Sequence, residues 1–147
     1  FFRMFRFGEK VTYLIFRRSE LEEYLSREEV LEFFDKMGYQ EMNLGKILVD
    51  FQKRYWTYMN KSREFPHEMG LLLGYPLEDV KGFVDQKGKN YLYSGYWKVY
   101  ANLNEKTELF QKYDKVQEEL IYLVSEGFLI KEIICLYEKE RPWRIAS

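Results

Sequence analysis

The chain has 147 residues, of which 46% are hydrophobic and 19% aromatic, and its 23 basic and 24 acidic side chains leave a formal net charge of −1. This length and apolar content are enough for a buried core and exclude a disordered chain. The near-zero net charge gives the molecule no overall attraction for nucleic acid or for an anionic membrane.

The first 18 residues predict a β-hairpin. Aromatic residues alternate over 1–7, the tripeptide 8–10 is typical of a turn, and the β-branched and aromatic run 11–18 is typical of a strand. Because both faces of the segment 11–18 carry apolar residues, we expect this second strand to be central and well buried.

Capping-box patterns at 19–22 and 26–29 predict two short helices, near 20–25 and near 27–37. In each pattern a Ser oxygen can accept a hydrogen bond from an unpaired backbone N–H while the Glu three residues later reaches back. Gly38 follows the second helix, where a left-handed residue is expected to end it.

A longer helix is predicted from about 43 to 59, because its apolar residues recur at helical spacing. Two shorter helices are predicted at 66–73 and 76–86. Pro66 and Pro76 each fit the first turn of a helix, where the missing N–H of proline costs nothing.

The aromatic run 91–101 predicts a strand that contains Gly95, and a glycine inside a strand often marks a bulge or a close backbone approach. Asn104 is then predicted to cap a long helix that Gly127 ends. The segment 129–138 has helical apolar spacing but also a β-branched run, so both helix and strand are open, and we favour helix.

These elements predict an α+β fold in which a small, mainly antiparallel sheet is packed by about six to seven helices. The sheet would combine the hairpin over 1–18 with the strand near 91–101. Because no internal repeat, low-complexity tract or linker is apparent, we expect a single domain over 1–147.

The single cysteine, Cys135, cannot form an internal disulfide, and its apolar neighbours predict a buried thiol. No apolar run approaches the ~20 residues that cross a bilayer, and no signal peptide is visible. We therefore expect a cytoplasmic protein without a membrane partner. The chain begins with Phe1 rather than Met, which we interpret as an N-terminally truncated piece of a longer protein.

His67, the only histidine, precedes Glu68 at the start of a predicted helix, and such a pair can serve in a metal or acid–base site. The zinc-binding helix pattern needs a second His four residues on, where this chain has Leu71. We favour the alternative that the pair caps the helix or that His67 makes a structural hydrogen bond. We predict no catalytic and no metal-binding residue, and the sequence identifies no cofactor.

Tyrosines alternate along the segment 91–100. They fit either an amphipathic wall of the core or the aromatic face of a ligand pocket. If the chain binds a ligand, we expect the site to use residues of both aromatic-rich segments. These are His67, Glu68, Tyr75, Tyr93, Tyr96 and Trp97.

Four arginines are predicted to lie on the N-terminal hairpin with aromatic residues between them: Arg3, Arg6, Arg17 and Arg18. Arginine and aromatic residues on one strand face are typical of proteins that bind single-stranded nucleic acid. The alternative is a set of surface charges that prevents edge-to-edge aggregation, and the near-neutral chain favours it.

The segments 65–83, 88–92, 95–100, 109–110 and 113–115 resemble a bacterial family known as the domain of unknown function DUF3793, found mostly in anaerobic Firmicutes. The resemblance spans most of the chain and implies a bacterial cytoplasmic domain with its signature at 65–83 and 91–100. It implies no reaction, because the family has no established activity.

Two departures from the family are expected to matter. Members usually carry a further N-terminal segment with a Cys-Ala-Pro-like motif, and this chain starts after it. Many members also have Cys where this chain has Ser94. Any function of that cysteine in relatives would be missing here.

Taken together, we favour a non-catalytic ligand-binding or accessory interaction domain over an enzyme, because no catalytic constellation accompanies the aromatic-rich segments. Its partner would be a small molecule or another protein. One alternative is a small enzyme or a metal- or haem-handling protein centred on His67 and the tyrosine-rich strand. A second alternative is a weak single-stranded nucleic-acid binder that uses the hairpin arginines.

Overall fold

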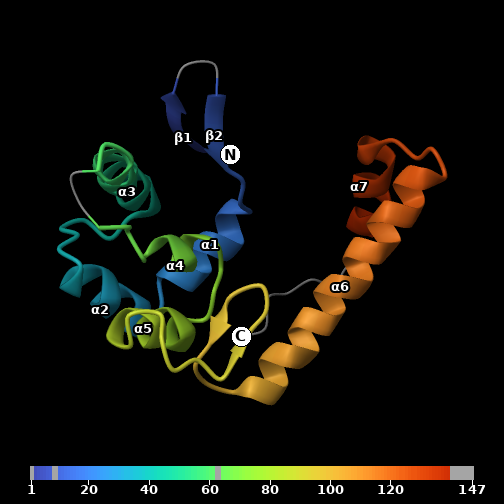
Figure 1. The fold of residues 1–147 in the computed structure, drawn as a ribbon. Helices are drawn as coiled ribbons and strands as arrows, with labels where there is room; N and C mark the ends of the chain where they lie inside the picture. Colours follow the sequence, from blue (N-terminus) through green and yellow to red (C-terminus); the bar gives the residue numbers. More distant parts are fainter. Residues whose placement is uncertain (1, 8–9, 62–63, 140–147) are drawn as a thin grey trace. The chain divides into compact units, whose positions relative to one another are not determined.

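The computed structural model describes residues 2–7, 10–61 and 64–139 (Figure 1). In these residues the chain forms seven helices and two small antiparallel sheets of two strands each, which confirms the predicted α+β class. The chain divides into two compact units, Phe1–Lys87 and Gly88–Ser147. The expectation of a single domain over the whole chain stays a prediction.

The predicted N-terminal hairpin is present as strands β1 (Phe2–Phe7) and β2 (Lys10–Leu14). The strands are antiparallel, with Phe2 opposite Leu14 and a register shift between Arg3 and Phe5. The hairpin therefore ends four residues earlier than the predicted strand 11–18.

The prediction that the second strand is central and buried on both sides is wrong. In the described part of the chain β2 pairs with β1 alone. Leu14 is buried, but Tyr13 is exposed and Ile15 beyond the strand is 84% exposed. Apolar residues on both faces of the segment suggested that both faces are buried. In the structure one face of the hairpin contributes to the core and the other face is exposed to solvent.

Five helices complete the first unit: α1 (Arg18–Leu25), α2 (Glu28–Lys36), α3 (Leu44–Met59), α4 (Met69–Leu72) and α5 (Leu77–Asp85). Their order is as predicted, although α4 is shorter than the expected 66–73. Gly38 follows α2 with φ +84° and Gly74 follows α4 with φ +79°. Glycine thus supplies the left-handed residue that ends each helix.

The two predicted capping boxes are wrong. Helix α1 begins one residue before Ser19, so that serine lies inside the first turn. Ser26 follows the end of α1, and its hydroxyl donates a hydrogen bond to the carbonyl of Glu23 over 2.7 Å. The residues that precede α1 and α2 are arginines without a side-chain cap hydrogen bond.

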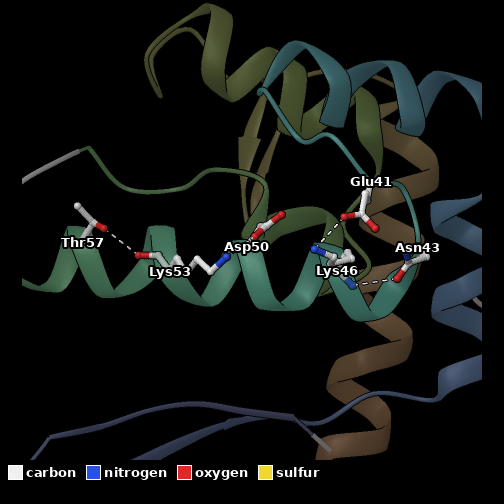
Figure 2. A network of polar contacts seen from close by, with 6 residues as sticks. All are labelled: Glu41, Asn43, Lys46, Asp50, Lys53 and Thr57. Carbon is white, nitrogen blue, oxygen red and sulfur yellow. Dashed lines mark hydrogen bonds and ion pairs between the residues drawn. The ribbon is translucent and has the colours of Figure 1, made fainter.

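Helix α3 has a polar side that begins with its cap (Figure 2). Oδ1 of Asn43 accepts a hydrogen bond from the backbone N–H of Lys46 over 3.0 Å. The ammonium of Lys46 lies 2.8 Å from Glu41, whose hydrogen bond raises the pKa of this lysine. One turn further on, Lys53 contacts Asp50 at 2.8 Å and lowers the pKa of that carboxyl. These exposed pairs order the helix surface and contribute little to stability.

The core of the first unit collects apolar residues from the hairpin and all five helices: Met4, Leu14, Leu21, Leu25, Val30, Phe33, Phe34, Tyr39, Ile47, Leu48, Phe51, Leu71, Leu72, Leu77 and Val80. The segment 65–83 supplies four of them. Between α4 and α5 the packing is close, since a Cβ added to Gly70 would lie 2.8 Å from Cγ2 of Val80. This stretch is therefore a structural part of the core.

The second unit contains a short hairpin and two helices: β3 (Tyr93–Ser94), β4 (Lys98–Val99), α6 (Leu103–Ser125) and α7 (Ile130–Lys139). The helix favoured for 129–138 is confirmed. The single strand predicted over 91–101 is wrong, because the chain reverses where the N–H of Gly95 donates to the carbonyl of Trp97 over 3.1 Å. Strands β3 and β4 pair with each other, and the N-terminal hairpin forms a separate sheet.

A cap at Asn104, as predicted, would start the helix at residue 105, whereas helix α6 starts at Leu103. Asn102 precedes the helix in the left-handed conformation with φ +51°, and Asn104 lies inside the first turn. Gly127 has φ +90° and ends α6 as predicted. Among the described residues, the helices are too short or too polar to span a membrane.

Candidate functional site

The six residues predicted to bind a ligand are divided between the two units. His67, Glu68 and Tyr75 lie in the first unit, around α4, and Tyr93, Tyr96 and Trp97 lie in the second unit, in and beside the short hairpin. Each group has its own set of contacts. From these contacts we distinguish residues with a structural role from residues that are available to a partner.

Glu68 is a buried structural residue. Its Oε1 accepts hydrogen bonds from the hydroxyl of Tyr39 over 3.0 Å and from Nη1 of Arg54 over 3.5 Å. The guanidinium of Arg54 also lies over the Tyr39 ring, 4.3 Å from its centroid, and donates to the carbonyl of Met37 over 2.6 Å. These contacts join α3, the end of α2 and the start of α4.

The buried phenol of Tyr39 is held in its protonated form. Burial, followed by the charge of Glu68, raises the pKa of Tyr39 far above its ordinary value. The hydroxyl therefore remains a donor to Glu68. Although Glu68 stands at the position that precedes α4, its side chain makes no cap hydrogen bond, so its predicted capping role is wrong.

His67 is packed among aromatic rings. Its imidazole centroid lies 5.6 Å from the ring of Phe65 and 5.1 Å from the ring of Phe83. Phe65 in turn contacts Tyr58 edge to face at 5.1 Å. In the described part of the chain no three His, Cys, Asp or Glu side chains gather where they could hold a metal ion. The contacts of His67 are those of a residue that fills space between the segment before α4 and helix α5.

Tyr75 also has a structural role, through its backbone and its ring. Its carbonyl accepts a hydrogen bond from the hydroxyl of Tyr24 over 2.7 Å, which ties α1 to the loop between α4 and α5. Burial, followed by the charge of Glu78, raises the pKa of Tyr24 well above its ordinary value. The ring of Tyr75 lies beside Gly70, 3.3 Å from the position of an added Cβ.

The second unit presents an exposed aromatic group on its short hairpin. Within six residues of chain, four large side chains are each between 43% and 57% exposed: Tyr91, Leu92, Tyr93 and Tyr96. We call these four residues the hairpin surface. Trp97 is half-buried and packs edge to face on Phe110 at 4.6 Å.

The backbone of this hairpin lies directly on the ring of Phe110. A Cβ added to Gly95 would lie 2.4 Å from Cδ2 of Phe110, much closer than any real contact. The rings of Tyr93 and Tyr96 flank the same phenylalanine, at 6.2 Å and 5.4 Å. The close approach predicted at Gly95 is therefore confirmed, at a turn instead of inside a strand.

Polar contacts fix two of the exposed tyrosines. The hydroxyl of Tyr96 donates to Asp114 of α6 over 2.9 Å, and desolvation and this hydrogen bond raise the pKa of Tyr96. The ammonium of Lys98 lies over the ring of Tyr91, 4.7 Å from its centroid, and donates to the carbonyl of Gly88 over 2.7 Å. Tyr91 and Tyr96 of the hairpin surface thus have contacts within the second unit while they remain exposed.

The predicted arginine cluster does not lie on the N-terminal hairpin as a group. Arg17 precedes α1 and pairs with Glu20 at 3.2 Å, and Arg18 begins α1 and pairs with Glu22 at 2.9 Å. Arg3 is exposed on β1, and the side chain of Arg6 lies outside the described set. Two of the four arginines thus lie at the start of α1, each beside a glutamate of that helix, and not on the hairpin.

Two features of α7 differ from the sequence interpretation. Cys135 is exposed, so the predicted burial of its thiol is wrong. The residue two positions earlier, Ile133, is the buried one, and a separation of two residues in a helix places Cys135 on nearly the opposite side. The apolar run around Cys135 also leaves Ile130 and Ile134 exposed, a surface that helical spacing alone did not reveal.

Comparison with known proteins gives one family. A family model described as "Protein of unknown function (DUF3793)" matches residues 1–134. No curated protein gives a significant match, and no solved structure does.

Proposed function

Because the chain belongs to the DUF3793 family, whose description states no activity, we propose a function from the molecule's own surface: a non-catalytic interaction domain. One observation carries this proposal. The hairpin surface exposes three tyrosines and a leucine within six residues, on a backbone that rests on Phe110. In line with its single cysteine, we further propose that the protein works in the bacterial cytoplasm.

The chemistry of the hairpin surface suits a binding role. Tyrosine offers a large contact area with only two side-chain torsions to order, and it is enriched where proteins bind each other. The contacts of Tyr91 with Lys98 and of Tyr96 with Asp114 order these side chains before a partner arrives. Such preorganisation lowers the entropic cost of association.

A protein is a better match to this surface than a small molecule. Small-molecule sites are concave and enclose most of their ligand, whereas these four side chains project from a short hairpin with nearly half of their area exposed. We therefore propose that the hairpin surface contacts a partner protein.

The first unit supports a non-catalytic role over the enzyme or metal alternative. Glu68, the natural acid–base partner of His67 in sequence, uses Oε1 to bind Tyr39 and Arg54. His67 itself packs between Phe65 and Phe83. Both residues are thereby accounted for by packing and hydrogen bonding in the fold.

Site-specific photo-crosslinking in cells of the source organism tests this proposal. A photoreactive phenylalanine analogue at Tyr93 is expected to give a discrete adduct with one partner, and the same analogue at exposed Trp56 of α3 is the control. The adduct should disappear when Tyr96 is also replaced by serine. Equal labelling from positions 93 and 56 would contradict the proposal, as would turnover of a substrate by the purified chain that is lost in His67→Ala.

A further inference from the structure

The hairpin surface has two halves that different contacts hold in place. Tyr93 lies in β3 and Tyr96 lies in the turn after it, and both rings flank Phe110 of α6. Tyr91 and Leu92 precede β3 and are outside the pairing of β3 with β4. The placement of this second half therefore depends on other contacts.

Lys98 of β4 supplies contacts to the second half. Its ammonium lies 4.7 Å from the centroid of the Tyr91 ring and donates a hydrogen bond to the carbonyl of Gly88 over 2.7 Å. A cation over an aromatic ring and a charged donor on a backbone carbonyl are both stabilising contacts. One side chain thereby joins β4 to two points of the segment 88–92.

The register of the hairpin places Lys98 on the face away from α6. Lys98 is opposite Ser94, so these two residues share one face of the hairpin. The neighbouring pair, Tyr93 and Val99, lies on the other face. Since Val99 is buried and Tyr93 lies beside Phe110, this other face is the one that packs on α6.

The segment 88–92 has a backbone that benefits from being held at both ends. Asn90 has φ +54°, a left-handed conformation that asparagine tolerates better than most residues but that still costs energy. The N–H of Leu92 donates to a carbonyl of β4 over 2.8 Å and holds the end of the segment. Lys98 holds its start, and the exposed ring of Tyr91 lies between these two points.

We propose that Lys98 is a positioning residue of the hairpin surface, which holds Tyr91 in the arrangement that the partner protein binds. This inference rests on the proposed function and adds the residue through which half of that surface is ordered. Lys98 is itself half-buried and acts through Tyr91, so its replacement should weaken binding of the partner while the fold is retained.

Photo-crosslinking from position 93 of the full chain tests the inference. Lys98→Met keeps a long apolar stem but removes the cation and the donor, and it should lower the yield of the partner adduct about tenfold. Lys98→Arg keeps a cation that stacks on aromatic rings and donates hydrogen bonds, so it should restore most of the yield. Lys89→Met, at an exposed lysine of the same segment, is the matched control and should leave the yield unchanged.

A double-mutant cycle distinguishes action through Tyr91 from a general structural role. Tyr91→Leu should lower the adduct yield by itself, and Lys98→Met added to it should lower the yield little further, because the two residues act as one unit. Two independent losses that multiply would contradict this mechanism. Circular dichroism checks that each variant keeps its helices.

A spectroscopic signature in the purified chain reports the contact without a partner. When lysine is isotopically labelled at Cε, the ring current of Tyr91 should move the Lys98 signal away from the signals of exposed lysines. Lys98→Met identifies this signal by its loss, and Tyr91→Leu should return it to the position of the others. This measurement tests the contact even if Lys98→Met reduces the yield of folded chain in cells.

The outcomes separate this inference from the proposed function. An unshifted Lys98 signal would overturn the inference, and so would an adduct yield in Lys98→Met that equals the yield of the unaltered chain. An equal loss in Lys89→Met would also overturn it, because loss of positive charge in general would then be the cause. All three results leave the proposed function in place, whereas an unaltered chain that forms no adduct from position 93 removes both.

Discussion

The hydroxyl of Tyr39 donates a hydrogen bond to Oε1 of Glu68 over 3.0 Å, across 29 positions of sequence. Both residues are buried. Tyr39→Phe should therefore lower the free energy of unfolding by about 1–3 kcal/mol, because a buried carboxylate loses a donor. Denaturation in urea measures the change. Tyr122→Phe, at an exposed tyrosine of α6, should stay within about 0.5 kcal/mol of the unaltered chain, and an equal effect of the two variants would contradict the prediction.

Alkaline pH should destabilise the fold through Tyr39 and Tyr24. Burial is the main cause that raises the pKa of each phenol, so the folded state holds both protons above the ordinary tyrosine pKa of 10.0 while the unfolded state releases them. Stability from these groups is complete below pH 10.0 and is lost as the pH rises further. Denaturation at a series of pH values should show this fall, with a shallower slope in Tyr39→Phe. A stability that does not change above this pH would refute the linkage.

Two substitutions of glycine by alanine should change the stability of the chain in opposite directions. Gly95→Ala places a methyl group 2.4 Å from the Phe110 ring, and it should destabilise the chain by about 1–3 kcal/mol. Gly45→Ala in α3 meets its nearest atom at 3.5 Å and should stabilise the chain by about 0.4–1 kcal/mol, because the unfolded state loses freedom. Chemical denaturation of both variants measures the two changes in the free energy of unfolding. If Phe110→Leu does not reduce the cost of Gly95→Ala, the contact is not its cause.

Cys135 should react with a thiol reagent in the native protein. Its side chain is exposed on α7, so modification by a chromogenic disulfide should reach one equivalent without denaturant. The Cys135→Ser variant provides the blank. A thiol that reacts only after unfolding would show the buried position that the sequence suggested.

The two compact units should unfold together if the chain is a single domain. Trp56 lies in α3 of the first unit and Trp97 lies beside the hairpin of the second, so each reports on one unit. Variants that keep one of these tryptophans and replace the other two by phenylalanine should give the same fluorescence midpoint in urea. Two separate midpoints would establish two independently unfolding domains instead.

Local patterns predicted the helices well. Apolar spacing located α3 and α7, and Gly38 and Gly127 were correctly expected to end helices, because these signals act within a few residues. The predictions of the two capping boxes and of a cap at Asn104 were wrong for a related reason. A serine or asparagine near a helix start can stand inside the first turn as easily as before it, and the sequence alone does not separate the two positions.

Relationships between distant segments could not be predicted. Nothing near Glu68 indicates that Tyr39 and Arg54 will bind it, so the pair His67–Glu68 suggested chemistry where the fold has a structural contact. The run 91–101 suggested a strand for the larger sheet, because its aromatic content is the same in a strand and in a tight hairpin over Phe110. Similarly, helical spacing identified α7 but not which of its sides is covered.

Because His67 packs between two phenylalanine rings, its imidazole protons can serve as a probe of this packing in nuclear magnetic resonance spectra. The chain has no second histidine, so the imidazole protons form an isolated pair of signals in a proton spectrum. With ring centroids only 5.6 Å and 5.1 Å away, the ring currents of Phe65 and Phe83 shift those signals from their random-coil positions. Any event that separates α5 from the segment before α4 should therefore move these two signals, and it can be followed without isotopic enrichment.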